Sequence, residues 1–157
     1  MAQVALGENF WMIEFLKLWS VAIAAAGGVF LIVDMIWLRF AVPMFYRPVL
    51  GELLAPKFRT APAVVFYLIY FAALGLFAVL PGFMSNGAPG LPLAGVPLSV
   101  VFGGAIGLTA YATYNLTNLA TLKGWASQLA LLDMAWGTVS SGLAAGSAAL
   151  ILIKFWA

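Results

Sequence analysis

Long apolar runs separated by short polar or Gly- and Pro-rich breaks dominate the chain. Four of these runs, at about 18–41, 61–80, 98–120 and 127–153, are each long enough to cross the hydrocarbon core of a bilayer, which takes about 20 helical residues. The pattern predicts an all-α polytopic membrane protein, a four-transmembrane-helix bundle in which residues 1–157 form a single transmembrane domain.

The three breaks between the runs differ in character. Pro81 predicts the end of the second span, and the uncharged residues 82–97, rich in Gly and Pro, predict a loop. The short turn around Lys123 predicts antiparallel third and fourth spans. Residues 43–60 mix basic with apolar side chains, which is typical of a short interfacial segment between helices 1 and 2; a solvated basic loop is the alternative.

Composition narrows the class of protein and of site. Hydrophobic residues make up 65% and charged residues 8% of the chain, which excludes an ordinary soluble domain and a disordered chain. The small, scattered net charge of +2 indicates no nucleic-acid partner. Because Cys and His are absent, the chain has no disulfide, no thiol nucleophile and no Cys or His metal ligand, so we expect no metal site and no cofactor.

The distribution of charged residues indicates whether the first apolar run is retained and on which side of the membrane the termini lie. Residues 1–16 contain acidic but no basic side chains, unlike the start of a signal peptide, so we expect the first apolar run to be retained as a span. Basic side chains favour the cytoplasmic side of a membrane, and they divide five against two between the two sides of a four-span bundle. The five are Arg39, Arg47, Lys57, Arg59 and Lys123, and the two are Lys17 and Lys154. This division predicts that both termini lie outside the cytoplasm.

A dense group of polar side chains lies within the third span. Residues 111–121, YATYNLTNLAT, contain two Tyr, three Thr and two Asn, and lipid offers these groups no hydrogen-bond partner. One helical face carries Tyr111, Tyr114, Asn115 and Asn118, and the threonines form a stripe elsewhere. A span that is polar on two sides predicts the central helix of the bundle.

Two aspartates pose the same problem in other spans. Asp34 lies near the cytoplasmic end of the first span and Asp133 near the start of the fourth, at a depth similar to that of the asparagines. We therefore predict a buried polar cluster or ligand-binding pocket that opens toward the cytoplasmic leaflet. Its residues are Asp34, Trp37, Tyr111, Tyr114, Asn115, Asn118, Asp133 and Trp136.

Small residues predict close helix packing around this cluster. Gly142 and Gly146 on the fourth span, and Ala24 and Gly28 on the first, form pairs spaced by three residues that let helix backbones approach one another. We expect spans one, three and four to pack tightly. The second span, which is apolar throughout, is then the best candidate for a helix that faces lipid.

Three roles remain open for the aspartates. They can tie helices together, with Lys123 or Arg47 reaching Asp34; they can bind a polar head group; or they can relay protons. The chain contains no Ser-His-Asp set, no motif of paired carboxylates and no phosphate-binding glycine loop. No catalytic residue is therefore assigned, and an enzyme is the less favoured interpretation.

Five motifs carry a resemblance to a known family. They are DMIW at 34–37, FYRPVLGELL at 45–54, VVFYLIY at 64–70, YATYNLTNLATLKGW at 111–125 and LLDMAWG at 131–137. Over about residues 18–140 the chain resembles a family of small predicted bacterial inner-membrane proteins of unknown function. Together with the basic residues, the resemblance implies a multi-pass protein of the bacterial inner membrane with both termini periplasmic. The family usually has Asp where this chain has Asn115, a change that preserves hydrogen bonding but puts carboxylate chemistry at this position in doubt.

Two functional hypotheses follow. In the first, the protein is a non-catalytic accessory subunit, or an assembly or stabilising factor, of a larger inner-membrane complex whose other subunits are its partners. In the second, it binds, transports or modifies a lipid or isoprenoid-like amphipathic molecule, held by the polar cluster between Trp and Tyr rings. Small size, low charge and the absence of cofactor ligands favour the first hypothesis. Membrane lipids are expected partners in both.

Overall fold

The computed structural model describes the backbone of residues 2–91 and 93–156, and the side chains of residues 11–51, 53–91 and 93–156. Within these residues the chain is helical, and four helices are long and apolar enough to cross a membrane, which confirms the predicted all-α, four-span architecture. The elements are α1 (Ala2–Ala41), η1 (Val42–Tyr46), α2 (Arg47–Leu50), η2 (Gly51–Leu53), α3 (Thr60–Leu74), η3 (Gly75–Val79), α4 (Leu80–Met84), α5 (Val96–Thr121) and α6 (Ser127–Trp156).

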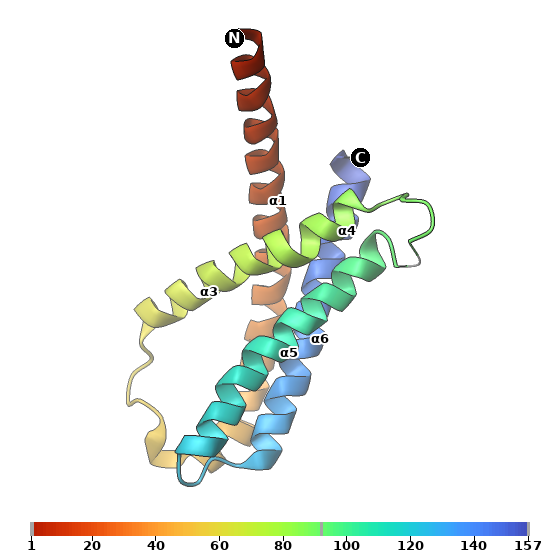
Figure 1. The fold of residues 1–157 in the computed structure, drawn as a ribbon. Helices are drawn as coiled ribbons and strands as arrows, with labels where there is room; N and C mark the ends of the chain where they lie inside the picture. Colours follow the sequence, from red (N-terminus) through yellow and green to blue (C-terminus); the bar gives the residue numbers. More distant parts are fainter. Residues whose placement is uncertain (1, 92, 157) are drawn as a thin grey trace.

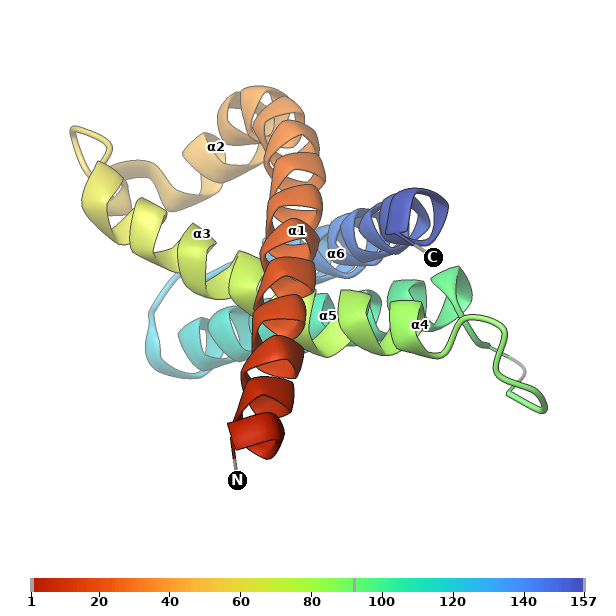
Figure 2. The same ribbon diagram turned by 90° about the horizontal axis from the view of Figure 1, so that it is seen from above.

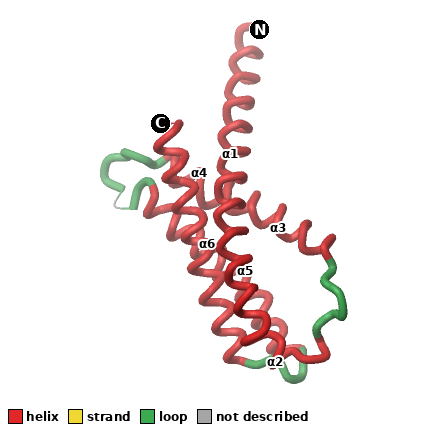
Figure 3. Tube along the Cα trace, turned by 180° about the vertical axis from the view of Figure 1, so that it is seen from behind, coloured by secondary structure: helices red, strands yellow, loops and turns green. Residues whose placement is uncertain are grey.

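The helices are arranged so that both termini lie at the same end of the molecule (Figure 1). Helix α1 stands upright, and its N-terminal part extends beyond the other helices. The hairpin between α5 and α6 lies at the opposite end, close to α2 (Figure 3). Seen from above, α3 and α4 form one oblique rod that crosses α1 (Figure 2). The second span therefore touches the bundle over only part of its length.

The connection after α1 is helical in its first part, through Leu53, and residues 54–59 form an open loop before α3. A π-helical turn, η1, continues α1 past Pro43, and a single α-helical turn, α2, follows it. Gly51 adopts a positive φ of 47°, a conformation in which glycine has no steric penalty, and the chain turns there into η2. The predicted short segment between helices 1 and 2 thus consists of brief helical turns followed by a loop.

The second span does not end where Pro81 predicts. The helix continues through this residue to Met84, because the chain has first widened into the π-helical turn η3. In this turn the Leu80 N–H donates to the Gly75 carbonyl, and the next residue, proline, has no N–H that needs a partner. A proline next to a π-turn is therefore accommodated without a break.

The expectation that the second span faces lipid is wrong for its second half. Leu74, Ala78 and Val79 are fully buried in the core. Gly75 brings the backbone close to α1, since a Cβ there would lie 3.1 Å from the Ile23 backbone nitrogen. The first half of α3, in contrast, leans away from α5 and α6 and is mostly exposed (Figure 1). An apolar run without periodicity does not indicate which part of the helix packs against the bundle and which part faces lipid.

Small residues bring α5 and α6 into backbone contact. A Cβ at Gly103 would lie 2.5 Å from the Ser141 carbonyl oxygen, and one at Gly107 would lie 2.1 Å from that of Gly137. These are distances that real Cβ atoms do not adopt, so only glycine fits this seam. The close approach predicted for the third and fourth spans is confirmed.

The predicted small-residue pair on the first span is wrong. Ala24 and Gly28 are exposed, and nothing lies within 4 Å of a Cβ placed at Gly28. The inward face of α1 is instead formed by Ala22, Ala26 and Phe30, all fully buried. The several alternative small residues in this alanine-rich stretch made the rotation of the helix ambiguous from the sequence.

Helix α6, and not α5, is the central helix of the bundle. Half of the most apolar window of α6 is buried, against 17% of the corresponding window of α5. The threonine stripe that suggested a central α5 faces outward, and the Thr113, Thr117 and Thr121 hydroxyls each donate to the carbonyl four residues earlier. A hydroxyl bonded to its own helix needs no partner from a neighbour, so threonine is a weak signal of burial.

Candidate functional site

Each of the four spanning helices brings a polar side chain to the same level. Asp34 lies seven residues from the end of α1, and Tyr67 lies seven residues from the start of α3. Asn115 lies six residues from the end of α5, and Asp133 six from the start of α6. At a rise of about 1.5 Å per residue, Asp34, Asn115 and Asp133 lie about 10 Å along their helices from these ends. Tyr67 reaches the same level from the oblique α3, because its hydroxyl bonds to Asp34.

Asp133 is held by two neutral donors. The Tyr46 hydroxyl, from η1, donates to its Oδ1, and the Asn115 Nδ2, from α5, donates to its Oδ2 at 2.7 Å. Asn115 is itself fixed, because its Oδ1 accepts a hydrogen bond from the Trp125 indole N–H at 3.3 Å. Asp133 is only 6% exposed, so this short network replaces the water that a surface carboxylate would have.

Asp34 is likewise held by two neutral donors, one from α3 and one from α6. The Tyr67 hydroxyl, from α3, donates to its Oδ2 at 2.6 Å, and the Trp136 indole N–H, from α6, donates to its Oδ1 at 3.3 Å. The Trp136 ring stacks on that of Trp37 with centroids 4.4 Å apart and planes 9° from parallel. The Trp37 Nε1 is buried near the Tyr46 hydroxyl without completing a hydrogen bond to it.

Tyr111 lies near both aspartates. Its hydroxyl interacts electrostatically with Asp34 and Asp133, and α6 carries both Asp133 and the Trp136 indole that donates to Asp34. The ring packs directly over Gly137, where a Cβ would lie 2.2 Å from it. The two carboxylates therefore belong to one polar cluster that draws on η1 and on all four spanning helices.

The cluster contains no positively charged partner. All four donors to the carboxylates are neutral, and all seven Lys and Arg side chains of the protein are exposed. Among the described side chains, the only ion pair joins Lys17 to Glu14. The contact of Lys123 or Arg47 with Asp34 that the sequence left open does not form.

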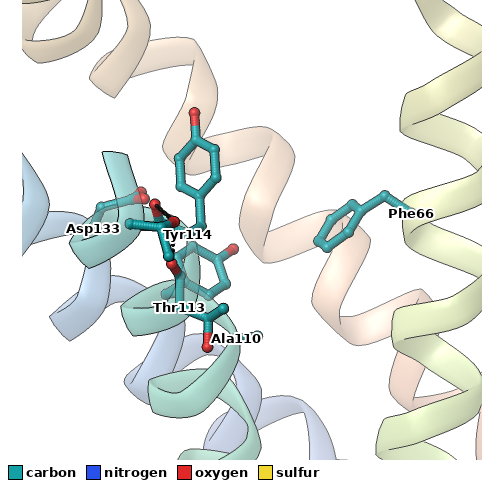
Figure 4. A pocket seen from close by; sticks show the side chains of 7 residues that line it. Phe66, Ala110, Thr113, Tyr114 and Asp133 are labelled. Atoms are coloured by element: carbon teal, nitrogen blue, oxygen red, sulfur yellow. Dashed lines mark hydrogen bonds between the residues drawn. The ribbon is translucent and has the colours of Figure 1, made fainter. Parts of the chain in front are cut away.

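A cavity of about 500 Å³ adjoins the cluster between α3 and α5. Figure 4 shows Phe66 on α3 facing Tyr114 and Asp133 across this space. Its rim is open, since Tyr114 is 55% and Phe66 44% exposed. The lining residues are Phe66, Ala110, Tyr111, Thr113, Tyr114, Thr117 and Asp133.

A second, shallower and more open cavity of about 390 Å³ continues the first along α5, toward the start of that helix. The two share Ala110 as a lining residue, and the second is mainly apolar. Its lining residues are Tyr70, Ala73, Ala105, Ile106, Thr109 and Ala110. Together the cavities form a groove between α3 and α5 with a polar end at Asp133 and an apolar end beside Tyr70.

Six of the eight predicted site residues meet in the cluster; they are Asp34, Trp37, Tyr111, Asn115, Asp133 and Trp136. Tyr114 lies outside the hydrogen-bond network but lines the cavity, with its ring edge-on to Trp125. Asn118 interacts with the Tyr114 hydroxyl and does not reach either aspartate. The part of α5 that belongs to the cluster is therefore one helical turn shorter than the polar face predicted from the sequence.

Sequence reasoning missed three members of the cluster. Tyr67 was overlooked because its span was expected to face lipid, although its distance from the helix end matches that of the aspartates. Tyr46 and Trp125 lie in connections, outside the spans in which partners were sought. A search for hydroxyl and indole donors in the spans at the depth of the two carboxylates would have found Tyr67, whereas Tyr46 and Trp125 reach the cluster from connections whose fold has no sequence signal.

Comparison with known proteins gives a family and no further relatives. No curated protein and no solved structure matches the chain. A family model described as "Predicted membrane protein (DUF2177)" matches residues 19–150, in agreement with the resemblance noted in the sequence. Because that match covers most of the chain, the protein belongs to this family of predicted membrane proteins.

Proposed function

We propose that the protein binds a lipid or isoprenoid-like amphipathic molecule in the groove between α3 and α5, for its transport or modification. The observation that carries this proposal is the pair of cavities that adjoin at Ala110, one with Asp133 and tyrosine side chains in its largely apolar lining and the other almost entirely apolar. Their volumes, about 500 and 390 Å³, fall in the range of small-molecule sites. Of the two hypotheses drawn from the sequence, this one is better supported by the geometry.

The position of the groove favours a ligand that arrives from the membrane. Its two sides are the half-exposed Phe66 and Tyr114, which would be covered by acyl chains in a bilayer. An amphipathic molecule can enter sideways between them without leaving the hydrocarbon region. Its polar end then meets Asp133 and Tyr111, and its apolar part lies beside Ala110 and Tyr70.

Native mass spectrometry of the protein released from its own membrane tests the proposal. The wild type should retain one amphipathic molecule, and Ala110→Phe should lose it, because the added ring fills the junction of the two cavities. Ala120→Phe is the matched control, since Ala120 is exposed on the same helix outside both cavities. Equal retention by both variants would overturn the proposal, as would a wild type that carries no such molecule.

A second candidate function, that of an accessory subunit, is favoured by the far end of α1. There Met12, Phe15 and Leu16 are exposed where the helix extends beyond the bundle (Figure 1). A helix of a larger complex could pack on this surface. Deletion of residues 2–17 should then abolish co-purification of a stoichiometric membrane partner, and a monodisperse monomer from native membranes would count against this role.

We also propose the bacterial inner membrane as the location, with both termini periplasmic. Five basic side chains lie toward the hairpin end and two toward the end that holds the termini, and basic residues favour the cytoplasm. Because the chain has no Cys, single Cys variants can report this directly. An impermeant thiol reagent should label Lys154→Cys in intact spheroplasts and Lys123→Cys only after lysis; the opposite pattern would reverse the orientation.

A further inference from the structure

We propose that the polar end of the bound molecule is a cation, an amine or a quaternary ammonium group. This inference rests on the proposed function and specifies the ligand class of the same groove. It follows from three features of the site: the Asp133 carboxyl group that lines the cavity, the aromatic side chains around it, and the placement of every basic side chain away from it.

Both oxygens of each aspartate face a hydrogen-bond donor. The Asn115 Nδ2 and the Trp136 Nε1 can only donate, and the two tyrosine hydroxyls donate as well. An ionised carboxylate has about four acceptor sites, so each aspartate retains about two for a further donor. A negative charge in the membrane is costly and is stabilised most by an opposite charge nearby.

The protein itself supplies no such charge. The exposed arginines and lysines lie on the surface, and the partners of both carboxylates are neutral. A ligand cation in the cavity would complete an ion pair with Asp133, which lines it. A phosphate or carboxylate head would meet the same group as a like charge, and this repulsion would reject it.

The walls of the cavity favour a cation by a second mechanism. Phe66, Tyr111 and Tyr114 all line it, and the faces of aromatic rings attract cations. Trp125 supports this wall, because its ring meets Tyr114 edge-on with centroids 5.5 Å apart. Aromatic rings around an acidic group are the arrangement that binds alkylammonium ions.

The test compares three single-chain amphiphiles of the same length by native mass spectrometry in neutral dodecyl maltoside micelles. They are hexadecyltrimethylammonium, hexadecanol and hexadecyl sulfate. The cationic probe should bind at least tenfold more tightly than hexadecanol, and hexadecyl sulfate should bind most weakly. Asp133→Asn, which keeps an oxygen acceptor for Tyr46, should reduce the preference for the cation over hexadecanol to about twofold.

A second variant tests the aromatic wall without touching the carboxylate network. Tyr114→Leu should weaken the binding of the cation several-fold more than it weakens the binding of hexadecanol. If all three probes bind equally and Ala110→Phe abolishes their binding, the inference about charge is wrong while the proposed function stands. If the probes bind equally to wild type and Ala110→Phe, both are wrong.

Discussion

Helix α5 meets α6 and α3 in opposite ways. Toward α6 it presents Gly103 and Gly107, and the two backbones touch along a seam that leaves no room for a methyl group. Toward α3 it presents Ala110 and Tyr114, and two cavities separate the helices. The seam holds Asn115 of α5 against Asp133 of α6 at 2.7 Å, while the open side leaves that same carboxylate accessible to a ligand.

The contrast separates residues that build the bundle from residues that shape the groove. In a membrane, tight packing of small residues stabilises helix pairs because lipid provides no hydrophobic drive for association. The polar cluster adds cross-links at one end only, through Tyr46, Tyr67 and Trp136. Substitutions on the two sides of α5 should therefore differ in kind, with stability affected on one side and ligand binding on the other.

The largest effect is expected at the seam. Gly107→Ala places a methyl group 2.1 Å from the Gly137 carbonyl oxygen and should destabilise the protein by about 3 kcal/mol, measured by SDS titration in mixed micelles. Gly28→Ala is the matched control, because nothing lies within 4 Å of the added methyl group. It should leave the free energy of unfolding unchanged or raise it by up to about 1 kcal/mol. Similar losses for both variants would show that the seam is not as close as described.

The next largest effect is expected in the polar cluster. Asp133→Ala leaves the Tyr46 hydroxyl and the Asn115 amide without their acceptor and should cost about 2 kcal/mol in the same titration. Asp133→Asn retains an acceptor oxygen and should cost about half as much. If both variants are as stable as the wild type, the carboxylate is not the acceptor for these groups.

A smaller loss of stability is expected where a single hydrogen bond joins α3 to the cluster. Tyr67→Phe removes the hydroxyl that donates to Asp34 at 2.6 Å and should cost about 1 kcal/mol, in the range measured for hydrogen bonds between membrane helices. Tyr114→Phe is its control, since that hydroxyl faces the open side and bonds to neither aspartate. If both variants lose the same unfolding free energy, the Tyr67 hydroxyl contributes no hydrogen bond to Asp34, and α3 is not part of the cluster.

The smallest effect is expected on the outward threonine stripe. The Thr121 hydroxyl bonds to the Thr117 carbonyl of its own helix, so Thr121→Val removes no contact between helices. The free energy of unfolding should change by less than about 0.5 kcal/mol. A loss above 1 kcal/mol would indicate that this stripe faces a partner and would favour the accessory-subunit function.

The sequence predicted the number of spans and the meeting of the two aspartates, and physical reasons explain both. A run of about 20 apolar residues has few alternatives to a membrane helix. A carboxylate in such a run must find partners, and Asp34, Asp133 and Asn115 lie at equal distances from one end. What remained hidden was the orientation of helices without polar residues. Leu74 of α3 and Ala26 of α1 are buried in stretches that are equally apolar on every face.

The groove was beyond prediction for a related reason. Its existence depends on where α3 leaves the bundle, and that point follows from the π-turn at Gly75–Val79 and the close approach of Gly75 to Ile23. Neither feature has a reliable sequence signal. The sequence indicated the polar half of the site, and the structure adds the apolar half beside Ala110 and Tyr70.

The central claim is that side chains distant in sequence bond to the aspartates within one cluster, and a double-mutant cycle between Tyr46 and Asp133 tests it most directly. These residues are 87 positions apart and bond only in the folded bundle. The unfolding free energies of the wild type, Tyr46→Phe, Asp133→Ala and the double variant should give a coupling energy of about 0.6–1.7 kcal/mol. If the stability losses of the two single variants add up to that of the double variant within about 0.3 kcal/mol, the two residues are not coupled. That result would contradict the cluster, and with it the site proposed around Asp133.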